Sequence, residues 1–474
     1  MDRRNFLASS ATLYTSAFLF HRKVAAALMM VPNERPEPSH RRFTSLAVED
    51  VIRQVSAAIR NPELRRLFEN CYPNTLDTTV FFSEEGGIED TFIITGDIDA
   101  MWLRDSTAQV WPYLPLVRKD EGLKKMIRGL VNRQAACVLL DSYANSFYRD
   151  ASRPSAWASD QPMPAPGVHE RKWEVDSLCY VIRLAYGYWK ASGDTTPFNE
   201  RWKKSMQTLV QTFRIEQRRN GQSPYRFRRV TSAMEDAPVH DGTGRPARYT
   251  GMIYSMFRPS DDATLFPFLI PSNLFAVQSL RQLAEMADIL LRDLNFASEC
   301  RTLAHEIEQG VKKFGIARHP VYGEIYAYEA DGYGNVVFMD DANTPSLLSL
   351  AYLGIHHPSD DIYQRTREFV LSSDNPWYIR GQAGEGIGSP HTGKENIWPM
   401  SVIMRALTSR RDEEILFCLK QLVDTHAGTY FMHESFHKDD PSRFSRSWFA
   451  WANTLMGELI LKVYQEKTYL LKSI

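Results

Sequence analysis

The sequence predicts an all-α protein whose helices form an (α/α)6 barrel. Apolar residues recur at the spacing of one helix face in about a dozen segments, whereas strand signals are few and short. Short connections alternate with long, polar connections rich in Gly, Pro and aromatic residues. A barrel of paired helices would gather the long connections on one face, and loops of that length in a compact domain are usually functional.

The helical pattern begins at Leu46, where Val48, Ile52 and Val55 fall on one face. Further helices are expected at 106–116, 119–145, 173–192, 196–216, 271–294, 297–314, 345–354, 358–372, 396–408, 411–426 and 445–465. Strands are expected at 91–95, 324–328 and 336–339, beside Gly-rich turns, as small hairpins near the functional loops. The long connections are 146–172, 217–262, 316–344, 373–395 and 428–444.

The N-terminal segment predicts export. Residues Arg3 and Arg4, followed by an uncharged stretch from Ala8 to Phe20, are typical of a twin-arginine signal. We therefore expect an export signal over 1–30, a Pro-rich linker over 31–45, one catalytic domain over 46–474, and a periplasmic or extracellular location. The charged run 21–23 interrupts the apolar stretch, so an uncleaved anchor or a mis-assigned start codon stays open. No later stretch approaches the ~18 apolar residues of a membrane span, and none is expected in the mature protein.

Composition excludes several partners and cofactors. The 56 Lys and Arg residues against 57 Asp and Glu residues leave a net charge of −1, which argues against a nucleic-acid partner. The five cysteines are scattered without C-x-x-C spacing, so no zinc site is expected. The Gly-rich loop 380–391 lacks the spacing of a phosphate cradle. We expect neither metal nor cofactor, and the sequence does not indicate an oligomeric state.

The loop ahead of the 106–116 segment is the first candidate for chemistry. It combines carboxylates, an indole and a guanidinium, in Asp97, Asp99, Trp102, Arg104 and Asp105. Charge-assisted hydrogen bonds and an apolar ring platform suit the binding of sugar hydroxyls. Capping of the following helix by Asp105 or Ser106 is an equally good explanation of those two residues.

A second loop carries two adjacent carboxylates, Asp261 and Asp262, after Arg258 and a proline. Such a pair often caps a turn. Near Phe257 and Phe266, however, a carboxyl group would keep its proton near neutral pH, as a general acid must.

A third loop contains His433 and Glu434 among apolar and aromatic residues. A lone glutamate in such surroundings needs a partner or a chemical role. Glu385, in the Gly-rich loop, competes with Glu434 for that role. Trp448, three residues before Trp451, is either a sugar platform or part of the core. Further candidates combine carboxylates with indole or amide groups at the start of helical segments: Trp173, Asp176, Asp341 and Asn343.

Taken together, these motifs resemble glycoside hydrolase family 125. The resemblance rests on the runs at 96–106, 258–262, 339–343, 398–400 and 433–436, and it extends from about residue 46 to the C-terminus. It implies an (α/α)6 barrel and a metal-independent, exo-acting α-mannosidase that removes terminal α-1,6-linked mannose with inversion.

The resemblance also implies roles for two carboxyl groups. The family's general acid corresponds to Asp261, chosen over Asp262 by likeness to related (α/α)6 glycosidases, and its general base to Glu434. The partners expected are an α-1,6-linked mannose glycan and one catalytic water. Two other functions stay open: another exo-α-glycosidase on the same barrel, and a non-catalytic glycan-binding protein.

Overall fold

Helices dominate the architecture. The computed structural model describes residues 34–221 and 223–474. Its α-helices are α2 (Leu46–Ala58), α3 (Pro62–Cys71), α4 (Asn74–Thr78), α5 (Leu103–Val110), α6 (Glu121–Leu140), α7 (Val175–Ser192), α8 (Glu200–Glu216), α9 (Val239–Gly242), α10 (Ile270–Ile289), α11 (Leu294–Phe314), α12 (Asp361–Val370), α13 (Pro399–Leu407), α14 (Asp412–Asp424) and α15 (Ala450–Lys467). The prediction of an all-α (α/α)6 barrel is confirmed.

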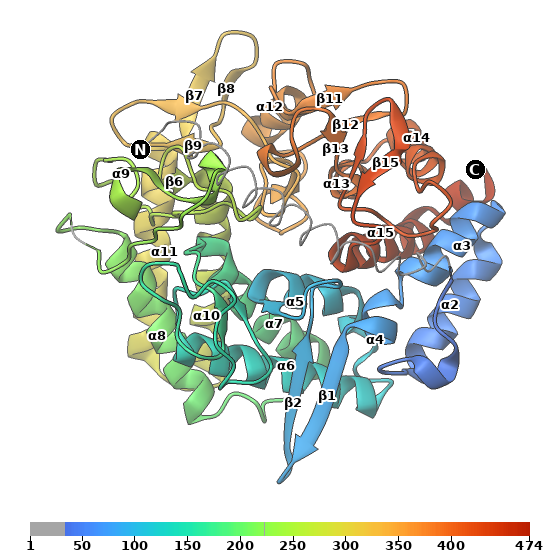
Figure 1. The fold of residues 1–474 in the computed structure, drawn as a ribbon, viewed down its shortest axis with the longest axis horizontal. Helices are drawn as coiled ribbons and strands as arrows, with labels where there is room; N and C mark the ends of the chain where they lie inside the picture. Colours follow the sequence, from blue (N-terminus) through green and yellow to red (C-terminus); the bar gives the residue numbers. More distant parts are fainter. Residues whose placement is uncertain (1–33, 222) are drawn as a thin grey trace, which may run out of the picture.

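The inner helices form a closed ring (Figure 1). In order around the ring, each touching the next, are α5, α7, α10, the 3₁₀ turn Leu348–Leu350, α13 and α15. The ring closes where α15 contacts α5. Helices α6, α8, α11, α12 and α14 form the outer layer, and α3 packs on α15, so the two ends of the described chain meet.

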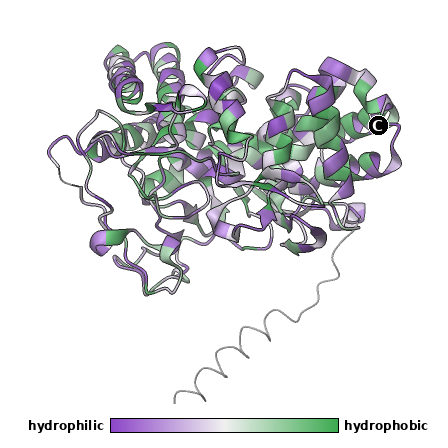
Figure 2. Ribbon diagram, turned by 90° about the horizontal axis from the view of Figure 1, so that it is seen from above, coloured by the Kyte–Doolittle hydropathy of each residue, from purple (hydrophilic) through white to green (hydrophobic). Residues whose placement is uncertain are grey.

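Burial follows this two-layer arrangement. The inner helices α7, α10 and α15 are buried on most of their surface. The outer helix α11 is amphipathic and buries only one face. In the perpendicular view of Figure 2, hydrophobic residues concentrate in the helical layer and the long connections gather on the opposite side. The functional loops therefore share one face of a rigid helical scaffold.

Strands serve as short braces for these loops. They are β1 (Val80–Glu85), β2 (Ile88–Ile93), β3 (Met101–Trp102), β4 (Ser146–Phe147), β5 (Val168–Glu170), β6 (Phe268–Leu269), β7 (Ile316–His319), β8 (Gly323–Tyr326), β9 (Glu329–Ala330), β10 (Val336–Val337), β11 (Tyr378–Arg380), β12 (Glu385–Ile387), β13 (Asn396–Ile397), β14 (Ser435–His437) and β15 (Asp440–Ser445). They pair as six antiparallel sheets of two or three strands. The three predicted strands coincide with β2, β8 and β10, and the partner of β2 is β1, which the sequence pattern missed.

Two predicted helices are shorter than expected. The segment 106–116 is α-helical only to Val110 and continues as a 3₁₀ turn, because Pro112 and Pro115 cannot donate to an α-helical ladder. The segment 345–354 contains only the 3₁₀ turn Leu348–Leu350. There the backbone amides of Leu347 and Leu348 donate to the buried Asp340 carboxylate, and not to the carbonyl groups of a preceding helical turn.

The predicted export signal over 1–30 lies outside the described residues and stays a prediction. From residue 34 the expected linker is attached to the domain, since Arg35 forms ion pairs with Glu49 at 2.7 Å and Asp77 at 2.8 Å. Within the described ranges, none of the helices is long and apolar enough to cross a membrane. All five cysteines are buried and unpaired.

Candidate active site

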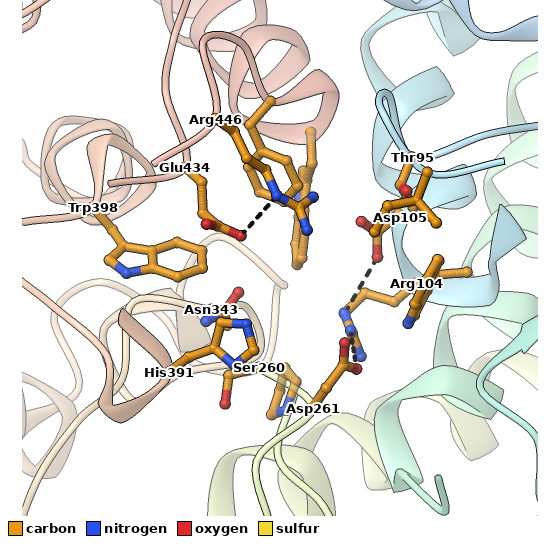
Figure 3. A pocket seen from close by; sticks show the side chains of 15 residues that line it. Thr95, Arg104, Asp105, Ser260, Asp261, Asn343, His391, Trp398, Glu434 and Arg446 are labelled. Carbon is orange, nitrogen blue, oxygen red and sulfur yellow. Dashed lines mark hydrogen bonds and ion pairs between the residues drawn. The ribbon is translucent and has the colours of Figure 1, made fainter. Parts of the chain in front are cut away.

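The candidate site is a pocket at the N-terminal ends of the inner helices. Trp102, Trp398 and Phe449 are the residues that precede α5, α13 and α15, and all three line it. The pocket encloses an empty volume of about 430 Å³. Its lining comprises Thr95, Ile98, Trp102, Arg104, Asp105, Pro259, Ser260, Asp261, Asn343, His391, Trp398, Glu434, Arg446, Phe449 and Trp451. Figure 3 shows the polar members of this set around a common space.

The wall formed by α5 carries a buried arginine and a buried acid. The helix begins at Leu103, so Asp105 lies inside its first turn and does not cap it. Burial raises the pKa of Asp105 to about 6, although the neighbouring Arg104 charge opposes the shift. Arg104 is only 3% exposed and points toward the carboxyl group of Asp261, 3.2 Å away (Figure 3).

Arg104 joins Asp261 to the start of α7. Its Nη1 donates to Glu174 Oε2 at 2.6 Å and to Asp176 Oδ2 at 3.2 Å. Both of these carboxyl groups are buried, and burial is the main cause that raises their pKa values. Asp176 thus holds the arginine from behind and does not line the pocket.

Asp261 sits in a tight turn whose backbone is strained. Its φ of 69° lies in the left-handed region, which is costly for a residue other than glycine. The neighbouring Asp262 points elsewhere and pairs with His391 at 2.9 Å. Asp261 lines the pocket and Asp262 does not. The geometry therefore separates two carboxyl groups that the sequence distinguished only through the resemblance to related glycosidases.

The prediction that Asp261 lies in apolar surroundings is wrong. Burial alone would raise the pKa of its carboxyl group, but the charges of Arg104, Lys172 and His391 and a hydrogen bond from Glu174 lower that pKa below the ordinary value. Glu174, the carboxyl group next to Asp261, has a pKa well above its ordinary value, mainly because it is buried. The two pKa values are shifted in opposite directions, so Glu174 holds a proton more readily than Asp261.

The opposite wall is formed by the loop that leads into β14. Glu434 is the residue before β14, and its Oε2 accepts a hydrogen bond from Ser445 at 2.9 Å. Arg446, just after β15, lies 3.4 Å from its other oxygen and 3.3 Å from Asp97. Figure 3 shows Glu434 and Asp261 extending into the pocket from different sides.

Several polar atoms in this pocket have no protein partner. Among the buried side-chain atoms of the described residues, those that line the pocket without a partner are Thr95 Oγ1, Trp102 Nε1 and Ser260 Oγ. Arg104 Nε and Asp105 Oδ2 make no hydrogen bond and meet each other as an ion pair at 3.5 Å. Buried polar groups are normally hydrogen-bonded, because leaving one unpaired costs about 1–3 kcal/mol. A ligand with many hydroxyl groups, placed between aromatic rings, satisfies such a set.

Of the predicted site residues, Trp102, Arg104, Asp105, Asn343, Asp261 and Glu434 line the pocket. Three others lie directly behind it. Asp97 pairs with Arg446, Asp262 pairs with His391, and Asp341 accepts hydrogen bonds from the backbone and side-chain amides of Asn343 at 3.0 Å.

The remaining predicted residues have structural partners away from the pocket. Asp99 is exposed and pairs with Arg153, and Arg258 pairs with the buried Glu329 at 2.7 Å. Trp173 is packed in the core and donates to the backbone oxygen of Tyr254.

Three further candidates, Glu385, His433 and Trp448, do not line the pocket. Glu385 pairs with Arg380 and with Arg405 and lines a separate hollow beside α14. His433 stacks on Phe444, and burial lowers its pKa to about 4. Trp448 packs beside Gly96, whose φ of 125° favours glycine and where an added Cβ would lie only 3.3 Å from the indole.

The residues missed by sequence reasoning are Thr95, Ile98, Pro259, Ser260, His391, Trp398, Arg446, Phe449 and Trp451. Most lie within or next to the motifs already singled out. His391 alone carries a distinct chemical signal: although burial opposes it, the Asp262 carboxylate raises its pKa to about 9, so the imidazole is charged at neutral pH. Its position in a Gly-rich loop gave no hint of that partner.

No group of three or more His, Cys, Asp or Glu side chains in the described part of the chain is arranged to hold a metal ion. The sequence matches the model of the metal-independent alpha-mannosidase family (GH125) over residues 61–461. It is 40% identical over 469 residues to the meiotically up-regulated gene 157 protein of Schizosaccharomyces pombe, an alignment that covers 94% of this chain and 91% of that protein.

Solved structures give the same relationship. A metal-independent alpha mannosidase of Streptococcus pneumoniae, in a non-productive complex with alpha-1,6-mannobiose, is 42% identical with a TM-score of 0.86, over 90% of this chain and all of the other. A wild-type glycosidase structure at 12% identity has a TM-score of 0.51 over 84% of this chain and 96% of its own, which is a likeness of fold alone.

Proposed function

The chain belongs to the metal-independent alpha-mannosidase family GH125 and is a glycoside hydrolase, and we propose that it removes terminal α-1,6-linked mannose from the non-reducing end of glycans with inversion of configuration. Asp261 is the general acid and Glu434 the general base. No metal takes part in these roles, since both are performed by carboxyl groups of the chain.

One observation carries this proposal. Asp261 and Glu434, which are far apart in the sequence, extend into a single pocket from different loops. The glycosidic bond is an acetal, stable until its leaving oxygen is protonated and a nucleophile approaches the anomeric carbon. Two carboxyl groups on different walls can perform those two tasks on opposite faces of one sugar.

The reaction then proceeds as a single displacement. Asp261 donates a proton to the departing oxygen, while the Glu434 carboxylate accepts a proton from a water molecule that attacks the anomeric carbon. Inverting glycosidases hold the two carboxyl groups roughly 6.5–9.5 Å apart to leave room for that water. Ser445 and Arg446 orient the Glu434 carboxylate, and each proton transfer contributes typically 10²–10⁴ in rate.

The same pocket accounts for binding of the terminal sugar. Trp102, Trp398 and Trp451 supply aromatic surface, and the side-chain oxygens of Thr95 and Ser260, which have no partner among the described residues, bond to sugar hydroxyls. Preference for the α-1,6 linkage is supported by the mannobiose complex of the pneumococcal relative.

The test is a panel of disaccharides. The purified protein should release mannose from α-1,6-mannobiose much faster than from the α-1,2 and α-1,3 isomers, and proton NMR should detect β-mannose as the first-formed product. An α-anomer would contradict inversion. Faster release of glucose from an α-glucoside would favour the alternative of another exo-α-glycosidase. A binding protein would retain the disaccharide intact.

A further inference from the structure

The candidate general acid, Asp261, lies among positive charges that favour its ionised form. A general acid must be protonated when the substrate binds. Arg104 and Lys172, however, both favour the ionised form of Asp261. A donor in this position therefore needs a nearby source of protons, and Glu174 is the carboxyl group held next to it by two shared donors, Arg104 and Asn145. Two carboxyl groups held this close favour a state in which one of them carries a proton.

Two bridging side chains hold this carboxyl pair together. Arg104 donates from Nη1 to Glu174 at 2.6 Å and from Nη2 to Asp261 at 3.2 Å. The amide nitrogen of Asn145 lies 3.3 Å from Glu174 Oε1 and 3.2 Å from Asp261 Oδ1. The orientation of that amide is fixed, because Asn145 Oδ1 accepts a hydrogen bond from the backbone of Lys172 at 3.1 Å.

The partner carboxyl is sealed from solvent while the acid is not. Glu174 is 1% exposed, and its Oε2 also accepts a hydrogen bond from Ser177 at 2.7 Å. The Asp261 side chain is 23% exposed and lines the pocket, with both bridging donors on Oδ1. Asp261 can thus reach a substrate, and Glu174 can reach the substrate only through Asp261.

The charges around the pair require a retained proton. The charged and titratable groups that face the two carboxyl groups are Arg104 and Asp105 on α5, His169 and Glu170 on β5, Lys172, Asp176 on α7, and His391. Of the cations, Arg104 is shared among four carboxyl groups, three buried ones and the partly exposed Asp261, and Lys172 also pairs with Asp236. Ionising every buried carboxyl group here would leave negative charge without compensation, which is costly in a site away from water.

We propose that Glu174 is the positioning residue that supplies the proton used by Asp261: it holds the proton in the resting enzyme and returns it to Asp261 when a glycosidic oxygen occupies the pocket. The inference rests on the proposed role of Asp261 as general acid. It assigns to a buried residue outside the pocket the function of keeping Asp261 protonated.

The protons balance over one turnover. Glu174 transfers its proton to Asp261, and Asp261 passes a proton to the leaving oxygen as the bond between that oxygen and the anomeric carbon breaks. Water adds its hydroxyl group to the anomeric carbon and gives its proton to Glu434. The carboxyl pair has then lost one proton and Glu434 has gained one, and exchange with solvent restores both.

The test compares Glu174→Gln with the matched control Asp176→Asn. Both residues are buried partners of the same Arg104 nitrogen, but only Glu174 also shares the Asn145 amide with Asp261. Activity is measured on α-1,6-mannobiose, which needs a proton on its leaving oxygen, and on 2,4-dinitrophenyl α-mannoside, which does not. We expect Glu174→Gln to lose about 100-fold in kcat/KM on mannobiose and less than about tenfold on the aryl substrate. The control should lose similar factors on both.

The pH profile provides a second readout. In the wild type, the alkaline limb of kcat/KM reports loss of the single proton held by the carboxyl pair. With glutamine at position 174, Asp261 must hold that proton alone beside Arg104 and Lys172, which lower its pKa, so the limb should move to lower pH by more than about one unit. Glu174→Asp keeps a carboxyl group and should show smaller changes than Glu174→Gln in both activity and pH profile. This variant keeps the test decisive if the glutamine variant folds poorly.

Two results separate the possible failures. If Glu174→Gln has the wild-type pH profile, or loses the same factor on both substrates, the proposal for Glu174 is overturned even when Asp261→Asn is inactive. If Asp261→Asn retains wild-type activity on mannobiose, the assignment of the acid itself is wrong.

Discussion

The two walls of the pocket hold their carboxyl groups in different ways. On the Asp261 wall, Arg104 is 3% exposed and is surrounded by four carboxyl groups from three segments of the chain. On the Glu434 wall, one serine and the partly exposed Arg446 are the polar partners of a single carboxylate. The first wall is a buried charge cluster anchored on inner helices, and the second is a pair of short strands and their loop.

This difference matches the tasks proposed for the two walls. A donor has to retain a proton in a cleft that water reaches, which requires buried groups that share it. A base needs only to be ionised and correctly oriented beside a water molecule. The comparison predicts that changes on the Asp261 wall alter proton supply and folding together, whereas changes on the Glu434 wall alter turnover alone.

The largest expected effects come from removing the two carboxyl groups. Asp261→Asn and Glu434→Gln should each lower kcat/KM on α-1,6-mannobiose by about 10²–10⁴. Only Asp261→Asn should recover on 2,4-dinitrophenyl α-mannoside, because that leaving group departs without protonation. Glu434→Gln should stay slow on both substrates, because water still has to be activated.

Circular dichroism of both variants serves as the control for folding. Equal recovery of the two variants on the aryl substrate would mean that the roles of the walls are not distinct. Recovery of Glu434→Gln alone would reverse the assignment of acid and base.

The next largest effect concerns stability. Arg104→Gln leaves buried carboxyl groups without their shared cation, and breaking a buried ion pair in this way typically costs about 3–5 kcal/mol. Arg446→Gln removes a guanidinium that is 26% exposed, for which about 0–1 kcal/mol is expected. Urea unfolding of the two variants, followed by tryptophan fluorescence, measures the difference. Equal midpoints would show that the Arg104 cluster is no more tightly coupled to the fold than the Glu434 wall.

The sequence predicted helices well where packing and local pattern agree. The outer helix α11 combines an apolar face with a polar one, and the expected 297–314 segment matches it closely. The expected helix 345–354 failed because the amides of Leu347 and Leu348 bond to the side chain of Asp340, seven and eight positions earlier, and the apolar periodicity does not register such a side-chain contact. Strand β1 failed for a similar reason, since its pairing with β2 lies partly in exposed polar residues.

The site residues likewise fall into those that local sequence motifs predict and those that only three-dimensional contacts identify. Motif likeness located Asp261 and Glu434, but three-dimensional contacts were needed to show that Asp262 turns toward His391 and that Glu385 belongs to an ion-pair network with Arg405. Glu174 lay beside two residues that were singled out and was itself overlooked, because its role depends on a partner almost ninety positions away in the chain.

The smallest effects sharpen the comparison at the edge of the pocket, where Asp97 and Asp99 are near neighbours with different partners. Asp97 pairs with Arg446, which in turn contacts Glu434, whereas Asp99 pairs with the exposed Arg153. Asp97→Asn should therefore lower kcat/KM on α-1,6-mannobiose by about tenfold or less, by loosening Arg446. Asp99→Asn should leave kcat/KM unchanged and alter stability by no more than ~1 kcal/mol, as expected for a surface ion pair. Steady-state kinetics of the two variants distinguish them. A loss of more than tenfold in kcat/KM for Asp99→Asn would mean that this loop closes over the bound sugar. The Glu434 wall would then include residues that do not contact the pocket in its resting state.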